Sequence, residues 1–385
     1  MRFLAILSTF STFFLAKRTQ AISFERMQKI SSKLVQKSHG SVFRNWRCLC
    51  FLCFLVFFSS CTTSKKRLYI YSWADFFAPE VLDQFEKDYN CSVIIDTFDS
   101  NETMYAKLVL GSKGYDIVIP SSYYLEIMKR KNMLEEIDYA KIPKFHNFDR
   151  RILQRLSPEL LEFGVPYSFT FTGIAWRKDK VHLTDPSWAI FGNDHYKGRM
   201  TLLNDPREVV AAGLQFLGYS INTTDQGEIA KAKRQVLTWK QNIAKFESEQ
   251  YKSGLASGEY LIAQSYQSDA LQLMKEHSNI AFSLAKEGSW FASDFLVIPK
   301  GAQNKELGLA FMNYLYDPQV AAKNMDHTAG FFPNTGAYLL VSPLIRDHIL
   351  TLLNTERFTS CQYVQDVGKD VVLYNTAWQE IKSHK

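Results

Sequence analysis

The chain has 385 residues, which is more than one hydrophobic core usually organises, so its length predicts two lobes or domains. Hydrophobic residues make up 46% and charged residues 22%, as in ordinary globular proteins. The net charge of +6 is unevenly distributed, because residues 1–60 hold nine of the 45 basic residues and one of the 39 acidic ones. The remainder has a slight excess of acids, which argues against a nucleic-acid-binding protein.

The amino-terminal segment has the pattern of a secretory signal. An apolar run of eleven residues, Cys48 to Phe58, follows two arginines and is too short for a transmembrane helix, which needs roughly 20 residues. The Ser59-Ser60-Cys61 sequence after it resembles a bacterial lipoprotein box, which implies that Cys61 is lipidated and becomes the mature amino terminus. We therefore expect residues 1–60 to be a leader, with an uncleaved membrane anchor as the alternative.

A second apolar run, Phe3 to Ala16, lies upstream of the first. Two signals in series are redundant, so we expect translation to start at Met27 and residues 1–26 not to be translated. After processing, Cys91 and Cys361 remain beside Cys61. An oxidising compartment would allow these two to pair, but two independently buried thiols are favoured.

The first part of the chain after the leader alternates between strand and helix patterns. The expected elements, in order, are a strand at Leu68–Ser72, a helix from Pro79, a strand at Ser92–Thr97, a helix from Asn101 and a strand at Tyr115–Pro120. This rhythm predicts a mainly parallel sheet covered by helices, in which ligands bind beyond the carboxyl ends of the strands. The loops at residues 73–76 and 121–124 therefore become candidates for ligand binding.

The alternation continues to the carboxyl end. The further elements expected are strands at Gly198–Leu203, Tyr260–Tyr266, Ile280–Leu284 and Phe295–Pro299, and helices from Pro206, at Ile229–Trp239 and at Lys305–Tyr316. No internal repeat or low-complexity tract occurs after residue 61. The pattern as a whole is that of an α/β protein.

Two segments, SNETMYAKL at Ser100–Leu108 and YDIVIPSSYY at Tyr115–Tyr124, resemble the spermidine/putrescine-binding family of bacterial solute-binding proteins. The resemblance implies a class II periplasmic-binding-protein-like fold, in which two α/β lobes are joined by a hinge and enclose a ligand cleft. It also implies the lobe boundaries. One lobe would hold residues 62–170 and 294–339, and the other would hold residues 171–293 and 340–385.

The sequence Asp205-Pro206-Arg207-Glu208 fits the start of a helix. Asp205 suits the N-cap, Pro206 suits the first helical position, and Glu208 is placed to complete a capping box. From the residues alone, capping is the favoured explanation. The family, however, has an acid pair in this motif that binds ammonium groups, so the resemblance implies that both carboxylates also bind ligand.

Asp294 lies directly before the apolar strand Phe295–Pro299, where a carboxylate is either paired locally or faces a cleft. The family has an acid at this position that holds a terminal amine. The resemblance implies further ligand contacts from eight residues, whose alternative roles are turn formation and packing: Trp73, Asp75, Phe76, Ser121, Tyr123, Tyr266, Phe331 and Gln365.

The aromatic side chains of the family's site are only partly retained. Tyr266 and Ala292 align with cleft tryptophans of the family, and Phe76 and Phe331 stand where it has hydroxyl-bearing rings. A polyamine needs carboxylates for its charges and flat aromatic walls for its methylenes and for cation–π contact. The carboxylates persist here and the walls are depleted, unless Trp290 or the adjacent Phe replaces the missing ring through a small change of register.

Sequence motifs of common enzymes are missing from the chain. It contains no GxxxxGK[ST], GxGxxG, GxSxG or HExxH, and its eight histidines are not spaced as metal ligands. We therefore expect a protein that is not an enzyme and that uses neither a cofactor nor a metal.

The expected function is that of a lipid-anchored periplasmic receptor of an ABC importer, which binds spermidine or putrescine between its lobes and contacts the permease subunits. Its partners would then be a polyamine, the permease and the membrane that holds the anchor, with no nucleic acid. Two alternatives remain open. One is the same fold binding another cationic amine or small solute, and the other is a surface lipoprotein with a role in adhesion or sensing.

Overall fold

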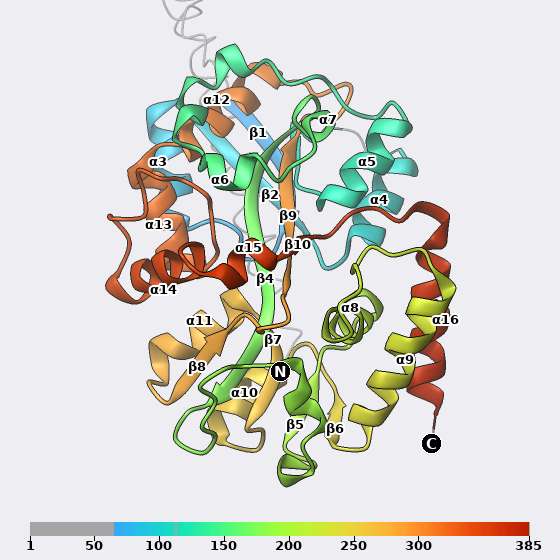
Figure 1. Ribbon diagram of the computed structural model, residues 1–385. Helices are drawn as coiled ribbons and strands as arrows, with labels where there is room; N and C mark the ends of the chain where they lie inside the picture. Colours follow the sequence, from blue (N-terminus) through green and yellow to red (C-terminus); the bar gives the residue numbers. More distant parts are fainter. Residues whose placement is uncertain (1–64, 112–113, 385) are drawn as a thin grey trace, which may run out of the picture. The chain divides into compact units, whose positions relative to one another are not determined.

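One mixed sheet of ten strands runs through residues 65–111 and 114–384, the part of the chain that the computed structural model describes (Figure 1). Its order is β2-β1-β3-β9-β4-β7-β5-β6, with β10 beside β9 and β8 beside β4. The predictions for residues 1–60, for Cys61 and for a start at Met27 fall outside the described residues. Among the described residues, no helix is long and apolar enough to cross a membrane.

The predicted β-α-β-α-β rhythm of the first part is confirmed. Strands β1, β2 and β3 are parallel, and Ile70 of β1 lies opposite Ile95 on one side and Ile117 on the other. The elements are β1 (Lys66–Trp73), α3 (Pro79–Asp88), β2 (Cys91–Phe98), α4 (Asn101–Val109), β3 (Ile117–Val118) and α5 (Ser122–Arg130). The third strand is shorter than expected, although Ile119 N still donates to Tyr71 O.

Two antiparallel strands, β4 (Gly164–Arg177) and β9 (Trp290–Val297), form the centre of the sheet. The sequence analysis predicted no strand over β4, and it placed the start of β9 five residues too late. The other strands are β5 (Met200–Leu202), β6 (Ile243–Phe246), β7 (Ile262–Tyr266), β8 (Ile280–Ser283) and β10 (Gln362–Tyr363). Strand β6 was not predicted either, whereas β5, β7 and β8 confirm predicted strands within about two residues.

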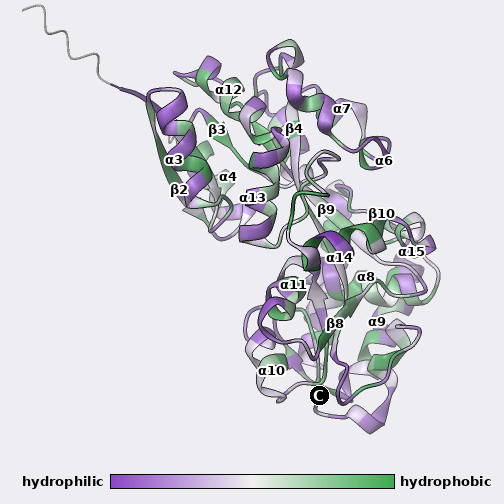
Figure 2. Cartoon of the chain, turned by 90° about the vertical axis from the view of Figure 1, so that its left-hand side faces the viewer, coloured by the Kyte–Doolittle hydropathy of each residue, from purple (hydrophilic) through white to green (hydrophobic). Residues whose placement is uncertain are grey.

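Helices cover the sheet, and several begin as predicted. The remaining ones are α6 (Arg150–Leu153), α7 (Pro158–Leu161), α8 (Pro206–Phe216), α9 (Gln226–Lys240), α10 (Tyr251–Ser257), α11 (Gln267–Glu276), α12 (Lys305–Leu315), α13 (Pro318–Thr328), α14 (Pro343–Leu353), α15 (Glu356–Ser360) and α16 (Val371–Ser383). Five short 3₁₀ helices lie at Tyr139–Lys141, Pro143–Asn147, Trp188–Gly192, Asp194–Tyr196 and Gly368–Asp370. The helices α8, α9 and α12 confirm predictions. In α3, hydrophilic and hydrophobic residues alternate (Figure 2), and Val81 and Phe85 are its buried residues.

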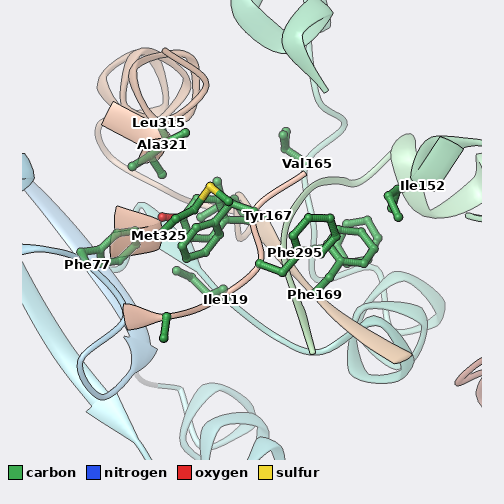
Figure 3. Close-up of a cluster of buried hydrophobic side chains, with 14 of the residues drawn as sticks. Phe77, Ile119, Ile152, Val165, Tyr167, Phe169, Phe295, Leu315, Ala321 and Met325 are labelled. Carbon is green, nitrogen blue, oxygen red and sulfur yellow. The ribbon is translucent and has the colours of Figure 1, made fainter. Parts of the chain in front are cut away.

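The buried hydrophobic residues form two clusters. The first gathers around β1, β3 and the second half of β9 and extends to α10, α11, β8 and α14. Figure 3 shows that its members come from elements far apart in the sequence. The second contains the fully buried Trp188, Trp239 and Trp290 and is closed by α8, α9 and α16. Cys91 and Cys361 are buried free thiols, which confirms the expectation that they do not pair.

Strand β8 lies so close to β4 at Gly173 that a larger residue there should destabilise the protein. A Cβ added at Gly173 of β4 would lie 2.6 Å from the carbonyl oxygen of Ser283 and 2.7 Å from Cζ of Phe282. The Ser283 carbonyl belongs to the backbone of β8 and cannot move away without disturbing the pairing of β8 with β4. Gly173→Ala should therefore lower the free energy of unfolding by about 1–3 kcal/mol. Urea denaturation measures this difference.

Gly308→Ala in α12 is the matched control. Its added Cβ would meet no atom closer than 3.5 Å, and a helix interior favours alanine over glycine by about 1 kcal/mol. This variant should be as stable as the wild type or more stable. If the two variants unfold at the same urea concentration, the proposed clash at Gly173 is wrong.

Candidate functional site

The candidate site lies on one face of the paired strands β4 and β9. Side chains alternate between the faces of a strand, so Trp290, Ala292 and Asp294 share one face of β9. The residues directly opposite them on β4 are, in the same order, Thr172, Thr170 and Ser168. Ala292 and Thr170 are half-buried although they lie in the interior of the sheet. The face is therefore open to solvent between a fully buried tryptophan at one end and a carboxylate at the other.

Asp294 is held by the loop that follows β3. The Ser121 hydroxyl donates to Oδ1 of Asp294 at 2.7 Å, and the two residues form a backbone bridge. Ser121 is fixed in turn by Asn101, whose Oδ1 accepts from Ser121 N at 3.0 Å and whose Nδ2 donates to Ser121 Oγ at 3.1 Å. Asn101 Nδ2 also lies 2.9 Å from the hydroxyl of Tyr123, which accepts from it. The predicted loop at residues 121–124 is thus locked against the first residue of α4.

The Asp294 carboxyl forms no ion pair with any side chain of residues 65–111 or 114–384. Burial raises its pKa to about 6, and the Ser121 hydroxyl and the Trp73 indole N–H oppose that rise. The Trp73 N–H is buried and makes no hydrogen bond of ordinary geometry within the described residues. A partly buried carboxylate with only neutral neighbours is costly when ionised, and a bound cation would remove that cost.

The other acids lie at the start of α8. Asp205 is the N-cap, and its Oδ1 accepts from the backbone N–H groups of Arg207 at 2.7 Å and Glu208 at 3.0 Å. This confirms the predicted cap. The Glu208 side chain does not turn back to complete a capping box. Its Oε2 instead accepts from the indole N–H of Trp290 at 2.9 Å, which links α8 to the open face of β9.

Burial raises the pKa of both acids. Burial, followed by repulsion from Asp205, raises the pKa of Glu208 to about 8, against hydrogen bonds from Thr172 and Trp290. Burial also raises the pKa of Asp205, and the exposed Glu102 of α4 adds to the shift. The neighbouring Arg207 faces elsewhere, because its guanidinium donates to Asn222 Oδ1 and lies over the ring of Tyr374.

Aromatic residues are placed unevenly around the site. Tyr266 of β7 lies directly opposite Thr172, and burial together with the charges of Glu208 and Asp205 raises its pKa. It therefore belongs to the end of the site that Glu208 occupies. Trp290 is 1% exposed and stacks on Trp188, with ring centroids 5.1 Å apart. Trp290 and Phe291, the two candidates to replace the wall missing at Ala292, are both buried in the hydrophobic clusters.

Asp75 and Phe76 follow Trp73 in the loop after β1, and their expected ligand contacts stay predictions. Asp75 is exposed, in a turn after β1 with a left-handed φ of 52°, and Phe76 is half-buried against Phe77 and Tyr167.

The expected ligand contacts of Phe331 and Gln365 stay predictions. Phe331 is 1% exposed, its backbone bridges to Phe169, and its ring packs against Phe169 and Phe171. The carbonyl oxygen of Gln365 accepts from the Arg207 guanidinium in the first turn of α8 at 3.4 Å. The Gln365 residue is exposed, and its backbone N–H binds Asn222 Oδ1. The described residues contain no cluster of acids, histidines and cysteines that could hold a metal ion.

The sequence analysis missed two residues of the site, Asn101 and Thr172, and it considered Trp290 only as a wall for the ligand and not as a partner of Glu208. Asn101 was noted only as a helix start. Thr172 lies in the strand that was not predicted. The position of Trp290 could have been found from the sequence, because it lies two residues before Ala292 and four before Asp294. These spacings place the three side chains on one face of a strand, provided that the strand begins before Phe295.

A separate surface cavity of about 570 Å³ lies away from these residues. Its lining comes from α3, α12, α13 and neighbouring turns, and includes Asp88, Lys144, Asp317 and Lys323. None of the predicted site residues lines it, so it is not part of the candidate site.

Over residues 80–349 the sequence matches the bacterial extracellular solute-binding proteins. The chain belongs to this family. The spermidine/putrescine-binding periplasmic protein of Salmonella typhimurium is 34% identical over 324 residues, which cover 83% of this chain and 93% of the relative. The putrescine-binding periplasmic protein of Escherichia coli K12 is 32% identical over 343 residues, covering 83% and 92%.

Solved structures agree with this assignment. The spermidine/putrescine transporter substrate-binding protein of Streptococcus pneumoniae matches this solute-binding protein with a TM-score of 0.77 and 27% identity, over 83% of this chain and 99% of the other. A lipoprotein of Treponema pallidum matches with a TM-score of 0.74 and 32% identity, over 82% and 99%. The predicted periplasmic-binding-protein-like α/β fold and the family resemblance are confirmed.

The raised pKa values predict how stability depends on pH. Asp294 and Glu208 bind protons more tightly in the folded state than in the unfolded chain, since their pKa values rise from 3.8 to about 6 and from 4.5 to about 8. Their protonation therefore contributes its full stability at pH values below the pKa values of the unfolded chain. This contribution is lost as the pH rises through about 6 for Asp294 and through about 8 for Glu208. Without ligand, the free energy of unfolding should fall by at least about 2 kcal/mol between pH 5 and pH 9.

The matched control is the double variant Asp294→Asn/Glu208→Gln, in which neither side chain titrates. Urea denaturation at pH 5 and pH 9 should show a clearly smaller fall for this variant than for the wild type. Equal falls in the two proteins would mean that other groups cause the pH dependence.

Proposed function

We propose that this protein is the periplasmic receptor of an ABC importer and binds a polyamine in a cleft between two lobes. The observation that carries the proposal is the open face of β4 and β9 with carboxylates at both ends. In the part of the chain that the structure describes, none of these carboxylates forms an ion pair, and the neighbouring Arg207 donates to Asn222 instead. A ligand with an ammonium group at each end would neutralise Asp294 at one end and Asp205 with Glu208 at the other. The names of the relatives, which are spermidine/putrescine- and putrescine-binding proteins, support this ligand class.

The spacing of the two ends suits an elongated diamine or triamine. Trp290 donates a hydrogen bond to Glu208 and lies four residues before Asp294 on β9. At roughly 3.3 Å per residue, the two positions are about 13 Å apart along the strand. Between them the face carries Ala292 and Thr170, whose small side chains leave room for methylene groups. Taking a multiply charged ligand out of water requires carboxylate partners, so these acids would dominate binding.

The predicted lobe boundaries and the hinge are part of the proposal. The two central strands contribute to both hydrophobic clusters, because Phe169 and Phe171 of β4 belong to the first cluster while Ile174 belongs to the second. Strand β9 likewise has Trp290 in the second cluster and Phe295 in the first. A hinge through these strands would let ligand favour a closed state, which the permease subunits recognise.

The same fold could instead serve another cationic amine. The observation that favours this second candidate is the depleted aromatic wall, because Ala292 has no ring and Phe331 lies in the core. A cation–π contact contributes about 0.5–2 kcal/mol, so its loss weakens selection for a particular amine without removing the charge complement. Binding would require no bond-making step, in keeping with the absence of an enzymatic motif from the sequence.

Asp294→Asn should weaken spermidine binding at least tenfold while leaving the fold intact. The change removes the charge but keeps the acceptor for the Ser121 hydroxyl. Losing one partner of a desolvated charge pair costs about 2–5 kcal/mol, which corresponds to a larger effect than tenfold. Isothermal titration calorimetry at pH 7.5 measures the affinity.

Asp88→Asn is the control for Asp294→Asn, because this exposed acid at the end of α3 lies apart from the candidate site. It should bind spermidine as the wild type does. Unchanged affinity in Asp294→Asn would remove Asp294 from the site, and a wild type that binds no polyamine would contradict the proposed function itself.

The lipid anchor at Cys61 is also proposed. The apolar run before Ser59-Ser60-Cys61 supports it, and the similar Treponema pallidum protein is described as a lipoprotein. Mass spectrometry of the mature protein should find residues 1–60 absent and acyl chains on Cys61. Two or more acyl chains give a stable anchor. Recovery of an unmodified peptide that spans Cys48 to Cys61 from membranes would contradict lipidation.

A further inference from the structure

Trp290 contacts the candidate site through its indole N–H group and not through the face of its ring. Its ring is 1% exposed and stacks on Trp188 at 22°, so it cannot serve as a wall for a ligand. Its only polar atom, Nε1, nevertheless points out of the core and donates to Oε2 of Glu208 at 2.9 Å. The rigid part of the side chain is thus fixed in the hydrophobic cluster, and its N–H reaches a partly buried acid.

We propose that Trp290 is a positioning residue, which fixes one oxygen of the Glu208 carboxylate so that the acid is held in place for an ammonium group of the ligand. The inference rests on the proposed polyamine binding and refines it. At this end of the site the indole acts on the acid and makes no contact with the ligand.

The surroundings of Glu208 explain why it needs such a donor. On its own helix Asp205 repels it, while Arg207 is turned toward Asn222 and the ring of Tyr374. From β7, Tyr266 faces it, with its own pKa raised by Glu208 and Asp205. No cation in the described residues forms an ion pair with Glu208, so the hydrogen bonds of Thr172 and Trp290 are the main interactions that favour its charged form.

The physical consequence is specific to the N–H group. Removing the donor while keeping the ring should leave the stack on Trp188 and should raise the pKa of Glu208 further. The acid would then be protonated, and unable to neutralise an ammonium group, over more of the neutral pH range. If the role of Trp290 were purely structural, removing its N–H group would lower the stability of the protein without changing the pKa of Glu208.

Trp290→Phe removes the donor and keeps a smaller aromatic ring in the cluster. Trp239→Phe makes the same reduction in size and is therefore the matched control. Trp239 is equally buried in the same cluster, against Phe191 and Phe216, and is not among the groups that shift the pKa of Glu208. Carbon-13 NMR of the glutamate carboxyls between pH 5 and pH 10, assigned with Glu208→Gln, follows Glu208 in the unliganded protein. Trp290→Phe should titrate at higher pH than the wild type, and Trp239→Phe should coincide with it.

The affinity for spermidine shows whether the positioning of Glu208 matters for binding. Trp290→Phe should bind about tenfold more weakly than the wild type at pH 7, as expected for a shift of one pKa unit, and the difference should narrow at pH 9. Trp239→Phe should follow the wild type at both pH values.

A titration of Glu208 that is identical in Trp290→Phe and the wild type overturns the inference, whether or not spermidine binds. Conversely, a shifted titration in a protein that binds no polyamine would support the positioning role and contradict the proposed function. If Trp290→Phe does not fold, the indole N–H resonance of Trp290 in the wild type decides. It should titrate together with Glu208 and lose that titration in Glu208→Gln, and a resonance that is independent of pH overturns the inference.

Discussion

The arrangement of the candidate site depends on partly buried carboxylates that form no ion pair with any side chain of the described residues. Burial raises the pKa values of Asp294 and Glu208, and repulsion from Asp205 raises that of Glu208 further. The protein opposes these shifts mainly with neutral donors, Ser121 and Trp290. Neutral donors fix the acids in place but do not neutralise them. A dication that reaches both ends would therefore gain more from binding than a singly charged or neutral solute, which ties the choice of ligand class to electrostatics.

The scaffold places these acids through backbone geometry. Strand β9 supplies Asp294, and it fixes Glu208 through Trp290, four residues earlier on the same face. The first turn of α8 fixes Asp205 by using its Oδ1 as the helix cap, so the residue that starts the helix also carries a charge of the site. Because Trp290 and Asp294 lie at different points along β9, a bend of β9 and its partner β4 would change the distance between the two ends.

Much of this could be predicted from the sequence, and the failures have physical causes. The first three strands and the start of α8 were predicted because β-branched runs, Pro206 and Asp205 act locally. Strand β4 was missed because both of its faces are largely buried, so it lacks the alternation that marks a half-exposed strand. The same gap hid Thr172. Asp294 and the two acids of α8 were predicted from a family motif, whereas the inward ring of Phe331 depends on a backbone bridge to Phe169 that no local pattern encodes.

A crystal structure of the protein with spermidine at pH 7.5 tests the central claim most directly. We expect one terminal ammonium group within about 3 Å of an Asp294 carboxylate oxygen, another at Asp205 and Glu208, and the methylene chain over Ala292 and Thr170. Spermidine bound elsewhere on the protein, or bound here with either end away from these carboxylates, would contradict the account.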